Sequence, residues 1–141
     1  MANPLKISEA ASLAFHAMVY LAMDADRTVS NRHIAGAFDA SEAHLAKVLR
    51  RLGRAGLVES SPGPGGGYSL GRPARTITLQ EVYEAVEGPL QPLGCLFGDP
   101  VCEGKRCIFG GELAGLDERL REWLRETKLS EVDHLFPVQA A

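Results

Sequence analysis

The stretch "SEAHLAKVLRRLGRAGLVESSPGPGGGYSLGR", residues 41–72, contains a helix pattern that runs directly into a strand pattern. Ser41 is the residue type that caps a helix N-terminus, and Gly56 is the type that ends one. The runs 57–61 and 68–72, joined by "PGPGGG", predict a β-hairpin. Between the two helix ends, apolar side chains recur at steps of three and four residues, as the buried face of an amphipathic helix requires: Leu45, Val48, Leu49 and Leu52.

A second, shorter helix pattern precedes this stretch. "NRHIAGAF", residues 31–38, follows Ser30 as a candidate cap, and the turn "DAS" separates it from the helix after Ser41. Two short helices joined by a tight turn and followed by a hairpin are the elements of a winged helix-turn-helix. The two helices alone also fit an amphipathic hairpin with a solvated basic face, and the β-hairpin favours the winged interpretation.

The flanking sequence predicts three more helices. If residues 8–23 form a helix, apolar side chains cover most of its circumference. This pattern predicts a buried helix capped by Ser8. "TLQE", residues 78–81, is a capping box that opens a helix ending at Gly88. Residues 111–129 place leucines and a tryptophan on one stripe. Because that stripe would otherwise be exposed, we expect it to pack on the first helix, on its twin in a second subunit, or on both.

These patterns predict a mainly α fold with a small β-hairpin wing. We expect a winged helix-turn-helix DNA-binding domain over residues 1–88, a cysteine-rich loop over 89–111, and a dimerisation helix with its tail over 112–141. The chain of 141 residues is 45% hydrophobic, which is enough to close a core.

Charge is distributed unevenly along the chain. Residues 27–75 carry eight Lys or Arg against three acids, whereas residues 76–141 carry six against twelve, in a protein of net charge −3. A basic segment inside an acidic protein suits a nucleic-acid-facing module attached to a sensing or assembly module.

Several functional classes lack support in the sequence. No apolar run approaches the ~18 residues of a membrane span, and no secretory signal is evident, so we expect a cytoplasmic protein without a membrane partner. No Ser-His-Asp arrangement, phosphate-binding loop or paired catalytic carboxylates appear, so we do not expect an enzyme.

All three cysteines, Cys95, Cys102 and Cys107, lie in the Gly-rich segment 94–111. An odd number of cysteines in a reducing compartment argues against a disulfide framework. Three thiolates on one loop fit an iron-sulfur cluster with one further ligand better than a zinc knuckle, given the C-x6-C-x4-C spacing. Unliganded buried thiols, and a redox pair with a spare thiol, are the structural alternatives.

Four motifs in order resemble the Rrf-type winged-helix repressors, typified by the iron-sulfur assembly regulator IscR and the nitric-oxide sensor NsrR. They are "L-x-K-V-L-x-x-L-x-x-A-G-L-V", "GPGGGY-x-L-x-R-P", "I-T-L-x-E-V-x-x-A-V-E-G" and the cysteine triad. The resemblance implies a homodimer that binds palindromic double-stranded DNA. It also implies a cluster, with 2Fe-2S favoured and 4Fe-4S possible, that controls operator affinity in response to redox state, nitric oxide or iron-sulfur status.

The chain departs from this family at the fourth cluster ligand. IscR-like members take a histidine three residues after the last cysteine, which is Gly110 here, and NsrR-like members take an aspartate whose matching position is Ser12. His16 lies one helical turn beyond Ser12 and resembles the histidine ligand of redox-sensing members. We therefore expect His16 as the fourth ligand, with Ser12, Glu9 and Asp99 as alternatives.

The resemblance also assigns DNA contacts. It places Ser41, Ala43, His44 and Lys47 in the major groove. Ser41 is also the expected helix cap. Arg50, Arg51 and Arg54 lie further along the helix, where phosphate contacts are expected. Gly65 and Gly66 would let the wing approach the DNA closely. The family's wing arginine is Pro62 here, so we expect weaker minor-groove contact or its supply by Arg72.

Two rival functions remain. One is a metal-free thiol-redox regulator of the same fold, in which oxidation joins or modifies the cysteines. The other is a small redox protein, which the winged-helix pattern argues against.

Overall fold

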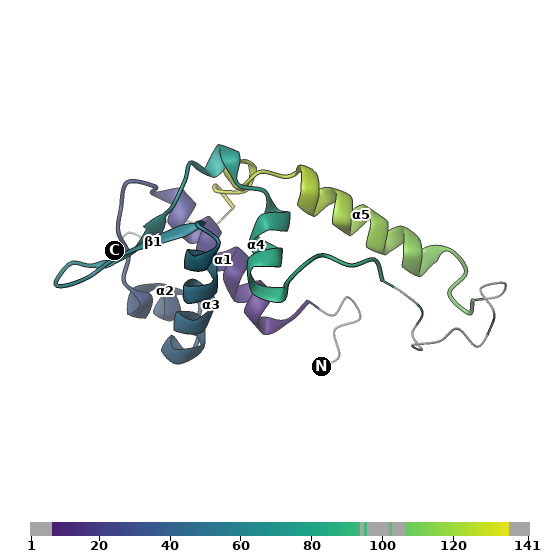
Figure 1. The fold of residues 1–141 in the computed structure, drawn as a ribbon, viewed down its shortest axis with the longest axis horizontal. Helices are drawn as coiled ribbons and strands as arrows, with labels where there is room; N and C mark the ends of the chain where they lie inside the picture. The colour runs from purple at the N-terminus through teal and green to yellow at the C-terminus, as the bar shows by residue number, and fades with distance from the viewer. Residues whose placement is uncertain (1–6, 94, 96–101, 103–106, 136–141) are drawn as a thin grey trace.

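Five α-helices and a two-stranded antiparallel hairpin make up the regular structure of the computed structural model, which describes residues 7–93, 95, 102 and 107–135 (Figure 1). Two short 3₁₀ turns, η1 (Ala74–Thr76) and η2 (Leu129–Glu131), complete it. The helices and strands follow one another in this order: α1 (Glu9–Met23), α2 (Asn31–Ala37), α3 (Glu42–Arg54), β1 (Val58–Ser61), β2 (Gly67–Leu70), α4 (Leu79–Glu87) and α5 (Glu112–Glu126). The predicted mainly α fold with a hairpin wing is confirmed.

Side-chain caps determine where four of the helices begin. The hydroxyl oxygens of Ser8, Ser30 and Ser41 each accept a hydrogen bond from a backbone N–H in the first turn of α1, α2 and α3. Thr78 and Glu81 form the reciprocal capping box at the start of α4. Each cap contributes about 1 kcal/mol, and all four were predicted from the sequence.

The core surrounds α1. This helix contacts α3, α4, β2 and η2, so most of its circumference is covered, as its uniformly apolar sequence predicted (Figure 1). The apolar face of α3 packs against it through Leu45, Val48, Leu49 and Leu52, each exposed by 2% or less. Burial of this face is what turns the charged face of α3 outward.

The hairpin is fastened to the helical core by backbone contacts. The N–H and C=O groups of Val29 and Tyr68 exchange hydrogen bonds of 2.8 and 2.7 Å, so the segment before α2 lies beside β2. A Cβ atom on Gly67 would stand 2.3 Å from the carbonyl oxygen of Val29. The close approach of the wing to the core therefore requires glycine at this position.

The C-terminal helix α5 packs on α4 and extends away from the rest of the molecule (Figure 1). Its C-terminal end is tied to the start of α4, since Leu79 N–H donates to Thr127 O and Leu129 N–H donates to Ile77 O. The stripe predicted on this helix is only partly covered, because Leu124 is buried while Leu116 and Trp123 are 46% and 57% exposed. Within the described part of the chain, no helix is both long and apolar enough to cross a bilayer.

Candidate nucleic-acid interface and cysteine loop

The second helix of the helix-turn-helix presents a cationic face. The side-chain amide of Asn31 donates to Glu42 O at 2.9 Å, which holds the start of α2 against the start of α3. With the leucines of α3 buried, the residues predicted to face DNA lie on the opposite side. They are exposed, except for the half-buried His44: Ser41, Ala43, Lys47, Arg50, Arg51 and Arg54.

The first turn of α3 also has local contacts. Ser41 Oγ accepts from His44 N–H at 3.2 Å, so this hydroxyl serves as the helix cap. The His44 Nδ1 atom lies 4.0 Å from Glu9 Oε1 of α1. This pair places an α1 carboxylate beside the N-terminal half of α3.

The three arginines of α3 differ in their surroundings. Arg51 Nη1 donates to Val86 O at 3.0 Å and so binds the last turn of α4. Arg50 and Arg54 instead line a hollow between α3 and the hairpin, together with Ser60 and Tyr68. These four residues carry two guanidinium and two hydroxyl groups, which are side-chain types that bind phosphate. Tyr68 was not predicted as a site residue, because its partners depend on how the hairpin folds back onto α3.

The wing tip is formed by glycines with different constraints. A Cβ atom on Gly66 would stand 2.2 Å from Ser61 O, so the turn itself excludes a side chain there. Gly65 has a φ of +74° with open space around its Cα, and lies at the exposed tip. Both glycines were predicted to approach DNA. At Gly66 the turn leaves no room for a Cβ atom, whereas at Gly65 only the positive φ favours glycine.

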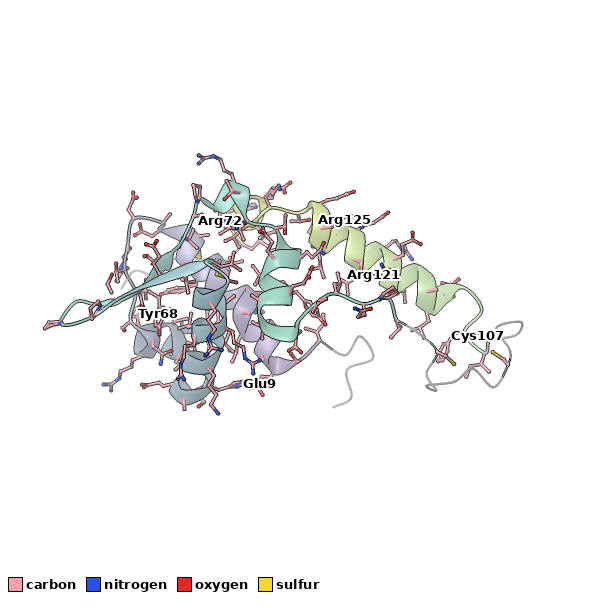
Figure 2. All side chains as sticks on the ribbon, viewed as in Figure 1. Glu9, Tyr68, Arg72, Cys107, Arg121 and Arg125 are labelled. Atoms are coloured by element: carbon pink, nitrogen blue, oxygen red, sulfur yellow. The ribbon has the colours of Figure 1, made fainter. Side chains whose placement is uncertain are left out.

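Arg72 lies at the base of the hairpin, in contact with α4 (Figure 2). Its Nη2 atom donates to both carboxylate oxygens of Glu81, at 2.6 and 2.7 Å, and to Thr76 O at 2.7 Å. Partial burial alone would raise the pKa of Glu81, but the hydrogen bonds from Arg72 and Thr78 and the Arg72 charge outweigh it and hold that pKa below its ordinary value. The structure thus gives Arg72 a structural role, and its contact with a minor groove stays a prediction.

Cys107 lies near the N-terminal end of α5, where this helix is farthest from the rest of the molecule (Figure 2). Cys95, Cys102 and Cys107 are all free thiols, with Cys95 and Cys107 exposed and Cys102 half-buried. Among the described residues, no three His, Cys, Asp or Glu side chains gather closely enough to hold a metal ion. Three thiols within one short segment nevertheless form a donor set chemically suited to an iron-sulfur cluster.

The predicted fourth ligands lie on α1, away from the cysteines. His16 is exposed, its Nδ1 atom lies 2.6 Å from Ser12 O, and its ring packs edge-on against Phe38. Figure 2 shows Glu9 and Cys107 well separated on the same subunit. The structure therefore does not bring the α1 candidates to Cys107 within one chain, and Asp99 lies outside the described residues.

Asp117 of α5 is a further residue that sequence reasoning missed. Its Oδ2 atom accepts from Leu93 N–H at 3.0 Å and from Arg121 Nε at 2.9 Å. The Asp117–Arg121 spacing of four residues was visible in the sequence, but it indicates only a helical ion pair. The backbone partner two residues before Cys95 becomes visible only in the folded chain.

Comparison with known proteins identifies the family. Residues 7–134 match the model of the Rrf2 family, described as iron-dependent transcriptional regulators. IscR of Cereibacter sphaeroides, an HTH-type transcriptional regulator, is 32% identical over 139 residues, which cover 91% of this chain and 86% of that protein. BadM of Rhodopseudomonas palustris is 40% identical over 84 residues, and the match spans 60% of this chain and about half (54%) of BadM.

A solved structure supports the same assignment. CymR of B. subtilis, the global cysteine regulator of that organism, superposes with a TM-score of 0.76 at 28% identity, and the match covers 94% of this chain and 98% of CymR. The similarity in fold thus extends over nearly the full length of both chains. The chain belongs to the Rrf2 family of DNA-binding transcriptional regulators, which are not enzymes.

Proposed function

We propose that this regulator is a homodimeric repressor that binds a palindromic operator through α3 and the wing. The observation that carries this proposal is the exposed cationic face of α3 beside a glycine-tipped hairpin. Ala43, His44 and Lys47 would contact base edges in the major groove, with Ser41 at the cap, and Arg50 would contact phosphate. Residues 1–88 would form the DNA-binding domain, 89–111 the sensing loop and 112–141 the dimerisation segment.

The α5 helix supports a dimer as the assembly. Leu116 and Trp123, seven residues apart, lie on one side of the helix and are 46% and 57% exposed in the single subunit. A second copy of α5 packed against them would remove this apolar surface from water. A two-fold dimer also presents two copies of α3, which is the symmetry that a palindromic operator requires.

For the signal, we propose an iron-sulfur cluster held by Cys95, Cys102 and Cys107, with 2Fe-2S favoured. Because α1 and Cys107 lie apart in one subunit (Figure 2), we propose that the fourth ligand comes from α1 of the other subunit: the partner's His16, or the partner's Ser12 or the partner's Glu9. Bound there, the cluster would supply a group whose state responds to redox conditions, nitric oxide or iron supply. The protein residues would position the thiolates and transmit their arrangement to α3.

A metal-free thiol switch is the second candidate. The observation that favours it is the exposure of two of the three free thiols, Cys95 and Cys107, which leaves them open to oxidants. The similarity in fold to CymR, the global cysteine regulator of B. subtilis, is compatible with such a switch.

Anaerobic purification followed by a visible spectrum and iron and sulfide assays separates these two candidates. Charge-transfer bands with matching iron and sulfide would support the cluster, and a Cys107→Ser variant should then lose them. A colourless protein after anaerobic reconstitution would contradict the cluster and favour the thiol switch.

Selection of duplexes from a random DNA pool tests DNA binding independently of the cysteines. An enriched inverted repeat, bound much more tightly than random duplex, is the expected result. Failure to enrich any sequence by both the reduced and the reconstituted protein would contradict sequence-specific binding.

A further inference from the structure

The segment between α4 and Cys95 is anchored at both ends by side chains from different elements. We call residues 87–93, which begin with the last residue of α4, the strap. Immediately before it, Val86 O accepts the hydrogen bond from Arg51 of α3. At its far end, Leu93 N–H donates to Asp117 of α5. The strap therefore runs from a contact with the DNA-facing helix to a contact two residues before the first cysteine.

The body of the strap is also held in place. The Ser8 hydroxyl donates to the Glu87 carboxylate, which joins the start of the strap to α1. Leu90 packs against the core and, with residues from α1, α4 and α5, lines a cavity of about 230 Å³: Phe15, Tyr83, Leu120 and Leu124. Pro89 and Pro92 restrict the backbone of the strap and of the residues before them. With fewer accessible backbone conformations, residues 89–93 pass on a displacement better than an unrestricted segment would.

Asp117 is well placed to fix the far end. Its side chain is only 18% exposed, and the ion pair with Arg121 at 2.9 Å holds the carboxylate in position to accept from Leu93 N–H. Cys95 follows Leu93 by two residues, so its Cα lies within about 7 Å of the anchored position. Asp117 thereby limits where the Cys95 thiol can stand relative to α5.

We propose that Asp117 is a positioning residue for Cys95 and that the strap couples the chemical state of this thiol to α3 through the Arg51–Val86 contact. The coupling rests on the proposed DNA-binding function, whereas the positioning of Leu93 and Cys95 does not. Coupling between two sites is reciprocal. If the chemical state of Cys95 alters DNA affinity, DNA binding must alter the equilibrium between the states of Cys95 by the same factor.

The positioning is tested without DNA. In reduced, metal-free protein, hydrogen exchange of the Leu93 amide is measured by NMR in the parent protein and in Asp117→Ala, Asp117→Asn and Glu118→Ala. Loss of the acceptor should speed exchange about fivefold, the change that about 1 kcal/mol produces. Asparagine keeps an acceptor oxygen and should restore most of the protection, and Glu118→Ala, an exposed carboxylate on the same helix, should change nothing. Equal exchange in Asp117→Ala and Glu118→Ala would overturn the assignment.

The coupling is tested with Cys95 as the sole thiol, in a Cys102→Ser/Cys107→Ser background. Affinity for a selected duplex is measured before and after alkylation of Cys95 with iodoacetamide. We expect alkylation to change the affinity about fivefold, and we expect this ratio to approach one in Asp117→Ala and in Arg51→Ala. Arg50→Ala is the matched control, because it should weaken binding in both states and preserve the ratio.

The two tests separate failure of the strap from failure of the function. An unchanged ratio in Asp117→Ala, or no effect of alkylation in the Cys102→Ser/Cys107→Ser background itself, would overturn the coupling. If the parent protein binds no duplex selectively, the proposed function fails, and Leu93 exchange alone then decides the role of Asp117.

Discussion

Replacement of Gly67 by alanine should detach the wing from the core. The added Cβ atom would lie 2.3 Å from Val29 O and 2.7 Å from Ser30 N, and both neighbours are backbone atoms that cannot rotate away. Relief requires the hairpin to move, which breaks the two hydrogen bonds between Val29 and Tyr68. At about 1 kcal/mol for each hydrogen bond and about 1 kcal/mol for a residue at φ +153°, the free energy of unfolding should fall by roughly 3 kcal/mol.

Urea unfolding followed by circular dichroism measures this loss, at one protein concentration because a dimer's stability depends on it. Gly65→Ala is the matched control, since Gly65 also has a positive φ but has open space around it. Its expected cost is only about 1 kcal/mol. If Gly67→Ala were no more destabilising than Gly65→Ala, the hairpin would not be held by the Val29 contact and the reasoning would fail.

Three further predictions concern the proposed DNA contacts of α3, the proposed dimer and the Glu81 carboxylate. His44→Ala should lower the ratio of operator to random-duplex affinity about tenfold, whereas Arg50→Ala should weaken both equally and reduce the salt slope by about one; anisotropy titrations at several salt concentrations distinguish the two. Trp123→Ala should raise the dimer dissociation constant at least tenfold in sedimentation equilibrium, while the exposed Arg119→Ala should not. Because the folded-state pKa of Glu81 is lowered, its stabilisation is present above the unfolded carboxyl pKa of about 4.3 and is lost as the pH falls through the folded value. The stability difference between the parent protein and Glu81→Gln should therefore be constant near neutral pH and shrink below about pH 4.5, in urea unfolding at each pH.

Local patterns predicted most of the fold because each depends on residues close together in the sequence. A serine hydroxyl that caps a helix bonds a backbone N–H three positions later, as Ser41 does with His44. The period of the leucines in α3 likewise fixes which face is buried. The hairpin followed from two short apolar runs and the glycines between them.

Contacts between distant segments were not predictable in the same way. All three arginines of α3 were predicted to contact phosphate, yet Arg51 binds a carbonyl 35 positions away while Arg50 and Arg54 line the hollow beside the wing. The α5 stripe correctly indicated an apolar face, but periodicity does not specify its partner. Within the subunit α5 packs on α4, a partner that the sequence did not indicate, and the expected packing on a second subunit stays a prediction.

The strap limits how strongly Cys95 can influence α3. Both anchors are single contacts between a charged side chain and a backbone group, Arg51 with Val86 O and Asp117 with Leu93 N–H. Such a hydrogen bond contributes at most about 3 kcal/mol, and coupling through two contacts in series cannot exceed the weaker one. The strap can therefore alter operator affinity by no more than about 150-fold. A larger difference between the two cysteine states, persisting in Arg51→Ala, would require a second route, and the exposed face of α5 at Leu116 and Trp123 is where a change in subunit packing would act.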